Sequence, residues 1–286
     1  MQTLPDAEAS SQAGADIPAP LRWALLLATA AAVVLPLLAA VLGGFKTLGE
    51  LRTHPFGLPE VWQWQNYLNI LASARYWRLM GNSMLIASLS VLLTLTASTL
   101  AAFAFAHLHF VGSRLLLNYL LLGLMFPAAT AVLPLFIQIR DFGLLDSYWG
   151  VVLPQVAFGL ATSIVLLRNQ FDALPSELFE AAVMDGCGYF RYFGRIVLPL
   201  SRPTLATVAV ITFVNSWNGY LLPLVVLNSD AMYPWPLGIM AYQGEFSTDW
   251  HLVLAFITLT TLPAAIVFLA AQRYIVAGLT AGSVKA

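Results

Sequence analysis

The chain has 286 residues, of which 59% are hydrophobic and only 9% are charged, whereas soluble domains carry about 25% charged residues. This composition, with a mean hydropathy of +0.79, excludes an ordinary soluble protein and predicts an all-α, multi-pass membrane protein. The formal net charge of −1 offers no basic surface for nucleic acid. The single cysteine, Cys187, excludes an internal disulfide or a cysteine-based metal site, and we interpret it as a small packing residue.

The N-terminal part of the chain divides into three segments. Residues 1–20 are polar, with acidic and no basic side chains, and we interpret them as a disordered cytoplasmic tail. Residues 21–45 contain an apolar run from Trp23 to Phe45 that is long enough to cross a bilayer, so we predict an uncleaved first transmembrane helix. Residues 46–80 mix basic and aromatic side chains, which is typical of an extracytoplasmic segment lying along the membrane surface.

Five more charge-free runs follow within residues 81–275, giving six predicted spans. These runs are Ser83 to Ala106, Leu115 to Ile139, Trp149 to Leu167, Leu205 to Leu227, and Leu252 to Ala271. The loop 228–250 carries acidic residues but no lysine or arginine, which places it outside the cell by the positive-inside rule. An even number of spans then places both termini in the cytoplasm, including the C-terminal tail 276–286.

One charged stretch, Pro175 to Pro199, separates the fourth and fifth predicted spans. Its charges exclude a lipid-spanning segment, because each costs about 2.5–3.5 kcal/mol at mid-bilayer. Ser176 is placed to cap a helix, and Gly186 is expected to end that helix because glycine enters the left-handed conformation readily. A second helical run is predicted from Tyr189 to Arg195, after which Pro199 turns the chain back into an apolar span.

The first helix of this stretch is predicted to present a face of small residues. Leu178, Ala181, Ala182 and Asp185 recur at helical spacing, so another surface could approach them closely.

The spacing Glu180-Ala181-Ala182, Gly186, Ile196, Leu198-Pro199 resembles the EAA loop of permease subunits of ATP-binding-cassette importers. The resemblance implies a type I importer fold with a cytoplasmic coupling helix between the fourth and fifth transmembrane helices, docked on an ATPase subunit. The residues implied in ATPase coupling are Glu180, Ala181, Ala182, Asp185, Gly186, Ile196, Leu198 and Pro199. The alternative is an ordinary amphipathic hairpin with no motor attached.

The chain lacks the residues that would let it hydrolyse ATP. It has only two lysines, Lys46 and Lys285, and neither follows a glycine and precedes Ser or Thr as in a phosphate-binding loop. ATP hydrolysis is therefore expected in a partner chain, and we expect no catalytic residue, cofactor or metal here. The histidines His54, His107, His109 and His251 fall near predicted membrane boundaries, which favours interfacial positions over metal ligation.

The predicted spans contain no Asp, Glu, Lys or Arg, which counts against a proton-coupled secondary transporter. They do carry neutral amides and hydroxyls, most densely from Asn215 to Tyr220, a stretch that resembles the Ser-Trp-Asn element of sugar-type importer permeases. We predict a solute path at Asn215, Trp217, Asn218 and Tyr220. The alternative is that these residues only make hydrogen bonds between packed helices.

The C-terminal residues Gln272-Arg273-Tyr274, Val276, 278–282 and Val284-Lys285, together with Asn82-Ser83, resemble the smaller permease of the maltose-type subfamily. The resemblance implies an inner-membrane location and three kinds of partner: a second permease in a heterodimer, two ATPase subunits, and an extracytoplasmic sugar-binding protein that contacts 228–250. The alternative for 228–250 is that its aromatic residues only form an interfacial belt. An ion-coupled secondary sugar transporter and a non-transporting membrane scaffold remain as alternatives. The solute could be a sugar, a polyol or a glycerol-phosphate-type compound.

Overall fold

The computed structural model describes residues 18–125, 127–244 and 247–281, and side chains up to residue 272. The described residues form helices and connecting turns, with one isolated bridge between Gln243 and Thr248 and no strand among them. The predicted tail 1–20 lies almost entirely outside these ranges. Residues 276–281 of the predicted C-terminal tail continue the last helix.

Four helices are long and apolar enough to cross a membrane by themselves. They are α1 (Ala19–Gly44), α4 (Ala74–His107), α7 (Tyr148–Asp172) and α14 (Trp250–Ala281), the last judged over Trp250–Gln272. They coincide with the first, second, fourth and sixth predicted spans, but α4 begins at Ala74 instead of Ser83. Its added turns carry Arg75 and Arg78, which pair with Asp230, so this end of α4 is held by polar contacts that hydropathy does not register.

The segment 46–80, which we predicted to lie along the membrane surface, is partly helical. It contains two short helices, α2 (Leu48–Thr53) and α3 (Trp64–Ala72), before α4 begins. Thr47 caps α2 by accepting a hydrogen bond from the Glu50 amide. Tyr67 of α3 is buried against α1 and α14, and its hydroxyl donates to the Val41 carbonyl.

The third predicted span is broken. It consists of α5 (Ser113–Leu122), two short 3₁₀ turns, η1 (Gly123–Met125) and η2 (Ala128–Ala131), and α6 (Val132–Asp141). The two halves meet at 92°. Pro127 is extended, with φ −66° and ψ 126°, and has no amide hydrogen to continue a helix.

The fifth predicted span is also divided, at the residues singled out as a solute path. Helix α11 (Arg202–Trp217) stops there, and α12 (Leu221–Val226) begins after Tyr220. Gly219 lies between them, and glycine favours such a break because it stabilises a helix poorly. The described residues thus give four spans by single helices, or up to six if two bent pairs each count as one: Ser113–Met125 with Ala128–Asp141, and Tyr189–Leu200 with Arg202–Trp217.

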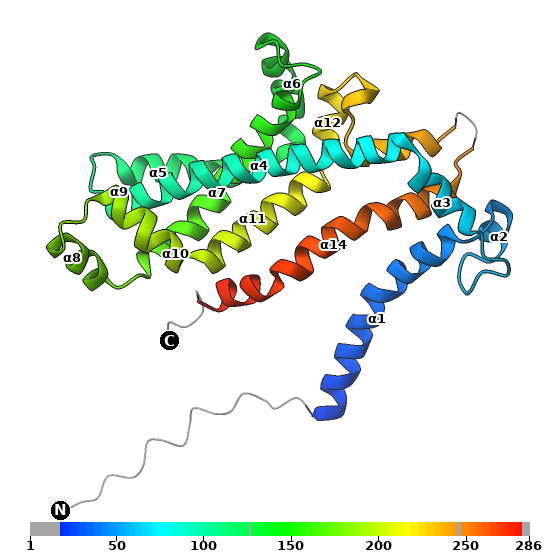
Figure 1. Ribbon diagram of the computed structural model, residues 1–286, viewed down its shortest axis with the longest axis horizontal. Coiled ribbons are helices and arrows are strands. Elements are labelled where there is room, and N and C mark those ends of the chain that lie inside the picture. The colour runs from blue at the N-terminus through cyan, green and yellow to red at the C-terminus, as the bar shows by residue number, and fades with distance from the viewer. Residues whose placement is uncertain (1–17, 126, 245–246, 282–286) are drawn as a thin grey trace, which may run out of the picture.

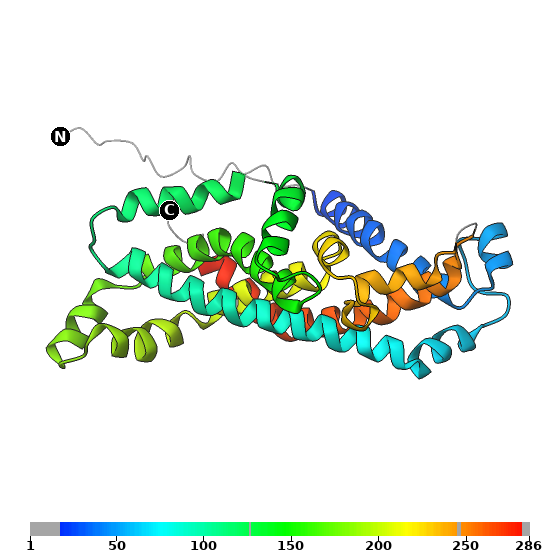
Figure 2. The same ribbon diagram turned by 90° about the horizontal axis from the view of Figure 1, so that it is seen from above.

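Helices α4, α11 and α14 lie roughly along one axis of the molecule, whereas α1 runs obliquely to it (Figure 1). Helix α4 packs along α7 and α11, and α14 packs on α11 and α1. Both views place the hairpin formed by α8 (Ser176–Met184) and α9 (Tyr189–Tyr192) at one end of this axis and α2 at the other (Figures 1 and 2).

The remaining elements are short. They are the π-helical turn η3 (Phe193–Val197), α10 (Leu198–Leu200), η4 (Asp230–Met232), α13 (Trp235–Gly238) and η5 (Ile239–Tyr242). Three apolar clusters hold the fold together: one joins α3, α4, α11 and α14, a second joins the hairpin to α4 and α7, and a third joins α4, α6, α7 and α12.

Candidate functional site

The α8–α9 hairpin is closed by a glycine turn with a well-defined hydrogen-bond pattern. The Cys187 amide donates to the Ala182 carbonyl at 2.8 Å, and the Gly186 amide donates to the Val183 carbonyl at 3.0 Å. These two bonds form a Schellman motif, in which the residue after the helix adopts the left-handed conformation. Gly186 does so with φ +69°, which confirms the helix end predicted from its glycine. Cys187 packs against the apolar cluster that contains Ala182, a contact that frequently accompanies this motif.

Two local predictions for the hairpin need correction. Ser176 is the first helical residue and makes no capping bond, because Pro175 occupies the capping position. The small-residue face is not wholly available to another protein: Ala182 is 5% exposed and packs with Leu178 in the chain's own core. Ala181 and Asp185 remain exposed.

Aromatic rings tie the hairpin to the end of α4. The His107 ring stacks on Phe103 with centroids 4.8 Å apart, and Tyr192 approaches Phe179 at 5.1 Å and His107 at 5.5 Å. Tyr192 is only 1% exposed. The hairpin is therefore anchored by packed rings, while Met184 and Phe190 at its surface are 87% and 90% exposed.

The chain leaves the hairpin through a π-helical turn and a sharp bend. Ile196 lies in η3, where the Leu198 amide bonds the Phe193 carbonyl five residues back. Pro199 has no amide to donate, and the helix that contains it meets α11 at 77°. Ile196, Leu198 and Pro199 are half-buried, so they form the joint between the hairpin and α11 and leave the outer surface to Glu180, Ala181 and Asp185.

A cavity of about 420 Å³ lies between the helices near the α11–α12 break. Its lining comes from α4, η2, α6, α7, α11 and α12 and includes no Asp, Glu, Lys, Arg or His. The lining residues are Ser90, Ala128, Ala129, Val132, Leu135, Gln155, Phe158, Gly159, Thr162, Ser163, Ile211, Thr212, Asn215, Ser216, Gly219, Tyr220, Leu221 and Leu222.

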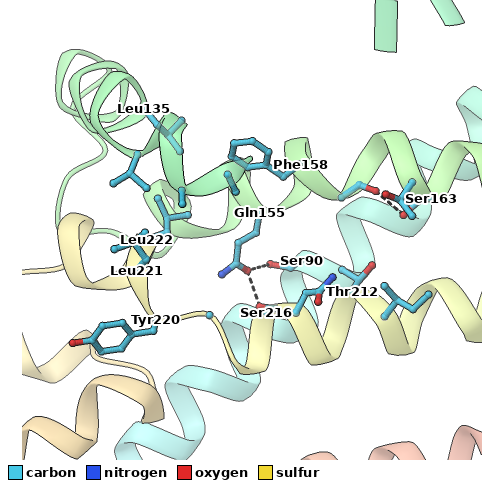
Figure 3. A pocket seen from close by; sticks show the side chains of 18 residues that line it. Ser90, Leu135, Gln155, Phe158, Ser163, Thr212, Ser216, Tyr220, Leu221 and Leu222 are labelled. Carbon is cyan, nitrogen blue, oxygen red and sulfur yellow. Dashed lines mark hydrogen bonds between the residues drawn. The ribbon is translucent and has the colours of Figure 1, made fainter. Parts of the chain in front are cut away.

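Gln155 connects three helices at this cavity. Its Oε1 accepts hydrogen bonds from Ser90 of α4 at 2.9 Å and from Ser216 of α11 at 2.7 Å (Figure 3). Its Nε2 has no partner among the described residues. A side chain on Gly219 would approach that nitrogen to 3.2 Å, so the glycine leaves room beside it. Gln155 therefore fixes the helices with one end of its amide and has a donor left at the other.

The four residues predicted for the solute path do not lie together. Asn215 and Tyr220 line the cavity, whereas Asn218 is exposed outside it at the end of α11. Trp217 is 1% exposed and points into the core against α14: it stacks on Phe213 and donates to the Thr260 carbonyl at 3.2 Å. Trp217 and Tyr220, three residues apart, would share a face of a continuous helix, but α11 ends between them.

In the sequence Gln155 is one of several neutral amides within the predicted spans, but we did not assign it to this site, and we did not single out Ser90. A glutamine in the middle of an apolar span is a usable signal, since its amide must find partners within the protein. Ser90 carried no such signal, because a single hydroxyl can bond to its own helix.

Comparison with known proteins places these features in a family. Residues 94–281 match the binding-protein-dependent transport system inner membrane component. The chain belongs to this family. The match contains the whole hairpin, α11 and the end of α4 that contacts the hairpin, so the aromatic anchor lies inside the family's common region.

Relatives match along most of the chain. The diacetylchitobiose uptake system permease protein NgcG of Streptomyces coelicolor is 35% identical, over 92% of this chain and 87% of the relative. The arabinooligosaccharides transport system permease protein AraQ of Halalkalibacterium halodurans is 35% identical, over 88% and 91%. The crystal structure of a bacterial ABC transporter that imports alginate contains a chain with a TM-score of 0.79 at 22% identity, covering 90% of this chain and 95% of that one. This chain therefore has the fold of an ABC importer permease.

Proposed function

We propose that this chain forms half of the transmembrane path of an importer for a neutral sugar or sugar-like solute, and that its α8–α9 hairpin couples the path to separate ATPase subunits. Family membership and the permease relatives support the transport role. The observation that carries the coupling role is the hairpin itself: a Schellman-closed helix at the end of the bundle, with exposed Glu180 and Ala181 on a base of packed aromatic rings.

The cavity supports a neutral solute. Its lining combines amide and hydroxyl groups with Phe158 and Tyr220 and has no ionisable side chain other than that tyrosine among the described residues. Amides and hydroxyls can bond sugar hydroxyls, and aromatic rings can pack on a sugar ring. Relatives named for diacetylchitobiose and for arabinooligosaccharides agree with this class.

The remaining parts of the proposal concern partners and orientation. A second permease would complete the path, two ATPase subunits would bind at the hairpin end, and a sugar-binding protein would bind at the opposite end. A structure of the alginate importer in complex with its pentasaccharide-bound periplasmic protein supports the last of these by likeness of fold. We propose six spans in the cell inner membrane, with both termini and the hairpin in the cytoplasm and residues 228–250 outside.

Co-purification tests the coupling role. An ATPase should be recovered with the tagged wild-type chain and lost with Glu180→Arg or Gly186→Trp, because both alter the exposed part of the hairpin. Gly57→Trp is the matched control, since Gly57 also has a positive φ (+101°) and open space around it but follows α2 at the far end. Normal ATP-dependent uptake by a stably inserted Gly186→Trp protein would refute the coupling role, and uptake that follows only the proton gradient would indicate a secondary transporter.

Asn215→Leu tests the solute path. The Asn215 side chain lines the cavity and makes no hydrogen bond to any described residue, so its replacement removes a solute contact without breaking an internal bond. We expect uptake of neutral disaccharides and oligosaccharides to fall about tenfold while the ATPase still co-purifies. Asn218→Leu, just outside the cavity, should have little effect. Equal loss in both variants would contradict the proposed path.

A further inference from the structure

Asn82 and Ser83 lie at a junction that the proposed transport role does not yet explain. Both are in α4 and buried, at 8% and 3% exposed. Asn82 Nδ2 donates to the Ala231 and Tyr233 carbonyls at 2.8 and 2.9 Å, and its Oδ1 accepts from the Tyr148 hydroxyl at 2.9 Å. The Asn82 amide thus uses both donor hydrogens and its acceptor to join three segments.

Ser83 adds a bond to the same segment. Its Oγ accepts from the Trp235 amide at 2.7 Å. Together, the two side chains hold backbone groups of the α12–α14 connection, defined here as residues 227–244 and 247–249. Bonds to backbone groups fix the position of this connection whatever side chains it carries.

Two further contacts bind the connection to α4. Asp230 pairs with Arg75 and, at 2.9 Å, with Arg78. Gly238 packs so tightly that an added Cβ would come within 2.6 Å of Leu79 and 2.7 Å of Phe256. The connection is therefore seated on α4 by hydrogen bonds, ion pairs and close packing.

Helix α4 also contacts the hairpin, at its other end. Phe103 and His107 pack with Tyr192, as described above. With 34 residues, α4 is about 50 Å long at 1.5 Å per residue, and it has no proline inside it to permit a kink. One unbroken helix therefore touches the proposed ATPase-docking hairpin at one end and the α12–α14 connection at the other.

We propose that Asn82 and Ser83 are positioning residues that make the α12–α14 connection move with α4, so that a change at the hairpin reaches the opposite surface of the protein. This inference rests on the proposed coupling role of the hairpin. It assigns the Asn82-Ser83 pair a task distinct from the solute cavity, since neither residue lines that cavity.

Hydrogen–deuterium exchange on the importer purified with its own partner subunits tests the proposal. The probe is ADP with magnesium and orthovanadate, which traps the ATPase subunits closed. In the wild type, trapping should change exchange both in hairpin peptides (176–195) and in peptides of the connection (228–244). In Asn82→Ala, the hairpin change should remain, and the change in the connection should be lost.

Separate variants keep the test decisive. Ser83→Ala removes the acceptor of the Trp235 amide, so the exchange of that amide should become about tenfold faster. If Asn82→Ala does not fold, Asp230→Asn takes its place in the test, because it perturbs only exposed ion pairs. Asn69→Ala is the matched control, because Asn69 is an exposed asparagine of α3 whose bond is to Gln65 one turn away.

The outcomes separate the two proposals. No response in the wild-type hairpin would overturn the coupling role itself. A response in the hairpin but not in the wild-type connection would overturn the present inference alone. A connection that responds equally in wild type and Asn82→Ala would also overturn it.

Discussion

The two ends of α4 are held by different chemistry. At the hairpin end, Phe103 and His107 meet Phe179 and Tyr192 through ring faces and edges. At the other end, Asn82 makes three hydrogen bonds to the chain around it. One junction is thus almost wholly apolar contact, and the other depends on directional bonds.

This difference bears on motion. Apolar contact has no strong directional requirement, so packed rings can slide by small amounts and still bury the same surface. Hydrogen bonds weaken steeply when their angle or length changes. We therefore expect the hairpin to adjust its angle on α4 when a partner docks, whereas the α12–α14 connection should keep one position on α4.

Removing the central ring of the hairpin anchor should have the largest effect. Tyr192→Ala should lower the free energy of unfolding by about 3–5 kcal/mol, because it leaves a large cavity in the apolar cluster. Phe190→Ala is the matched control: it removes a similar ring from the same helix, but Phe190 is 90% exposed. Denaturant titration in micelles measures both, and equal losses would contradict the assigned packing.

Two adjacent alanines sharpen the distinction between anchor and docking surface. Ala182→Leu should destabilise the protein by about 1–3 kcal/mol, because Ala182 is buried and overpacking strains a filled core. Ala181→Leu should leave stability nearly unchanged, because Ala181 is exposed, and should instead weaken recovery of the ATPase. Thermal unfolding and co-purification, measured on both variants, check the two halves of this prediction. If the two variants behave alike, the assignment of Ala182 to the buried face and Ala181 to the exposed face of the helix is wrong.

Local sequence signals predicted several features correctly. Gly186 ended α8 as expected, since the left-handed turn depends on a single residue type. The long apolar runs of α1, α7 and α14 were found from hydropathy alone. The family resemblance came from the spacing of the same hairpin, and the matched family agrees with it.

Features that depend on distant residues were not predictable in the same way. The inward orientation of Trp217 depends on its bond to Thr260 in α14. The early start of α4 depends on Asp230, far along the chain. The break at Pro127 could not be read from the sequence, because a proline in a span does not by itself say whether the helix bends or stops. Asn82 was named in the sequence only as part of the family resemblance. Its role as a junction could not be predicted there, because its three hydrogen-bond partners come from α7 and the α12–α14 connection.

A smaller polar contact helps to fix the same end of the molecule. Asp146 precedes α7, and its Oδ1 accepts from the amides of Asn228 and Ser229, both at 2.9 Å. Its own amide donates to the Val226 carbonyl at 2.9 Å. The residue has φ +51°, a conformation that aspartate and asparagine tolerate better than most side chains. Asp146 therefore ties the start of the α12–α14 connection to the loop before α7.

This carboxylate should make the start of the connection sensitive to acid. The Ser229 amide, and then the Asn228 amide, lower the pKa of Asp146 below its ordinary value of 3.8. Because the folded-state pKa is lowered, the stabilisation is fully present above about pH 4 and is lost as the pH falls through the lowered value. Asp146→Asn should speed exchange of these two amides by about three- to tenfold near neutral pH. It should also abolish the acid dependence of their protection after correction for the intrinsic exchange rate. The control Asp141→Asn removes only an exposed pair with Arg140, so it should change neither the exchange rate of these amides nor its acid dependence. If the acid dependence persists in Asp146→Asn, a group other than Asp146 causes it.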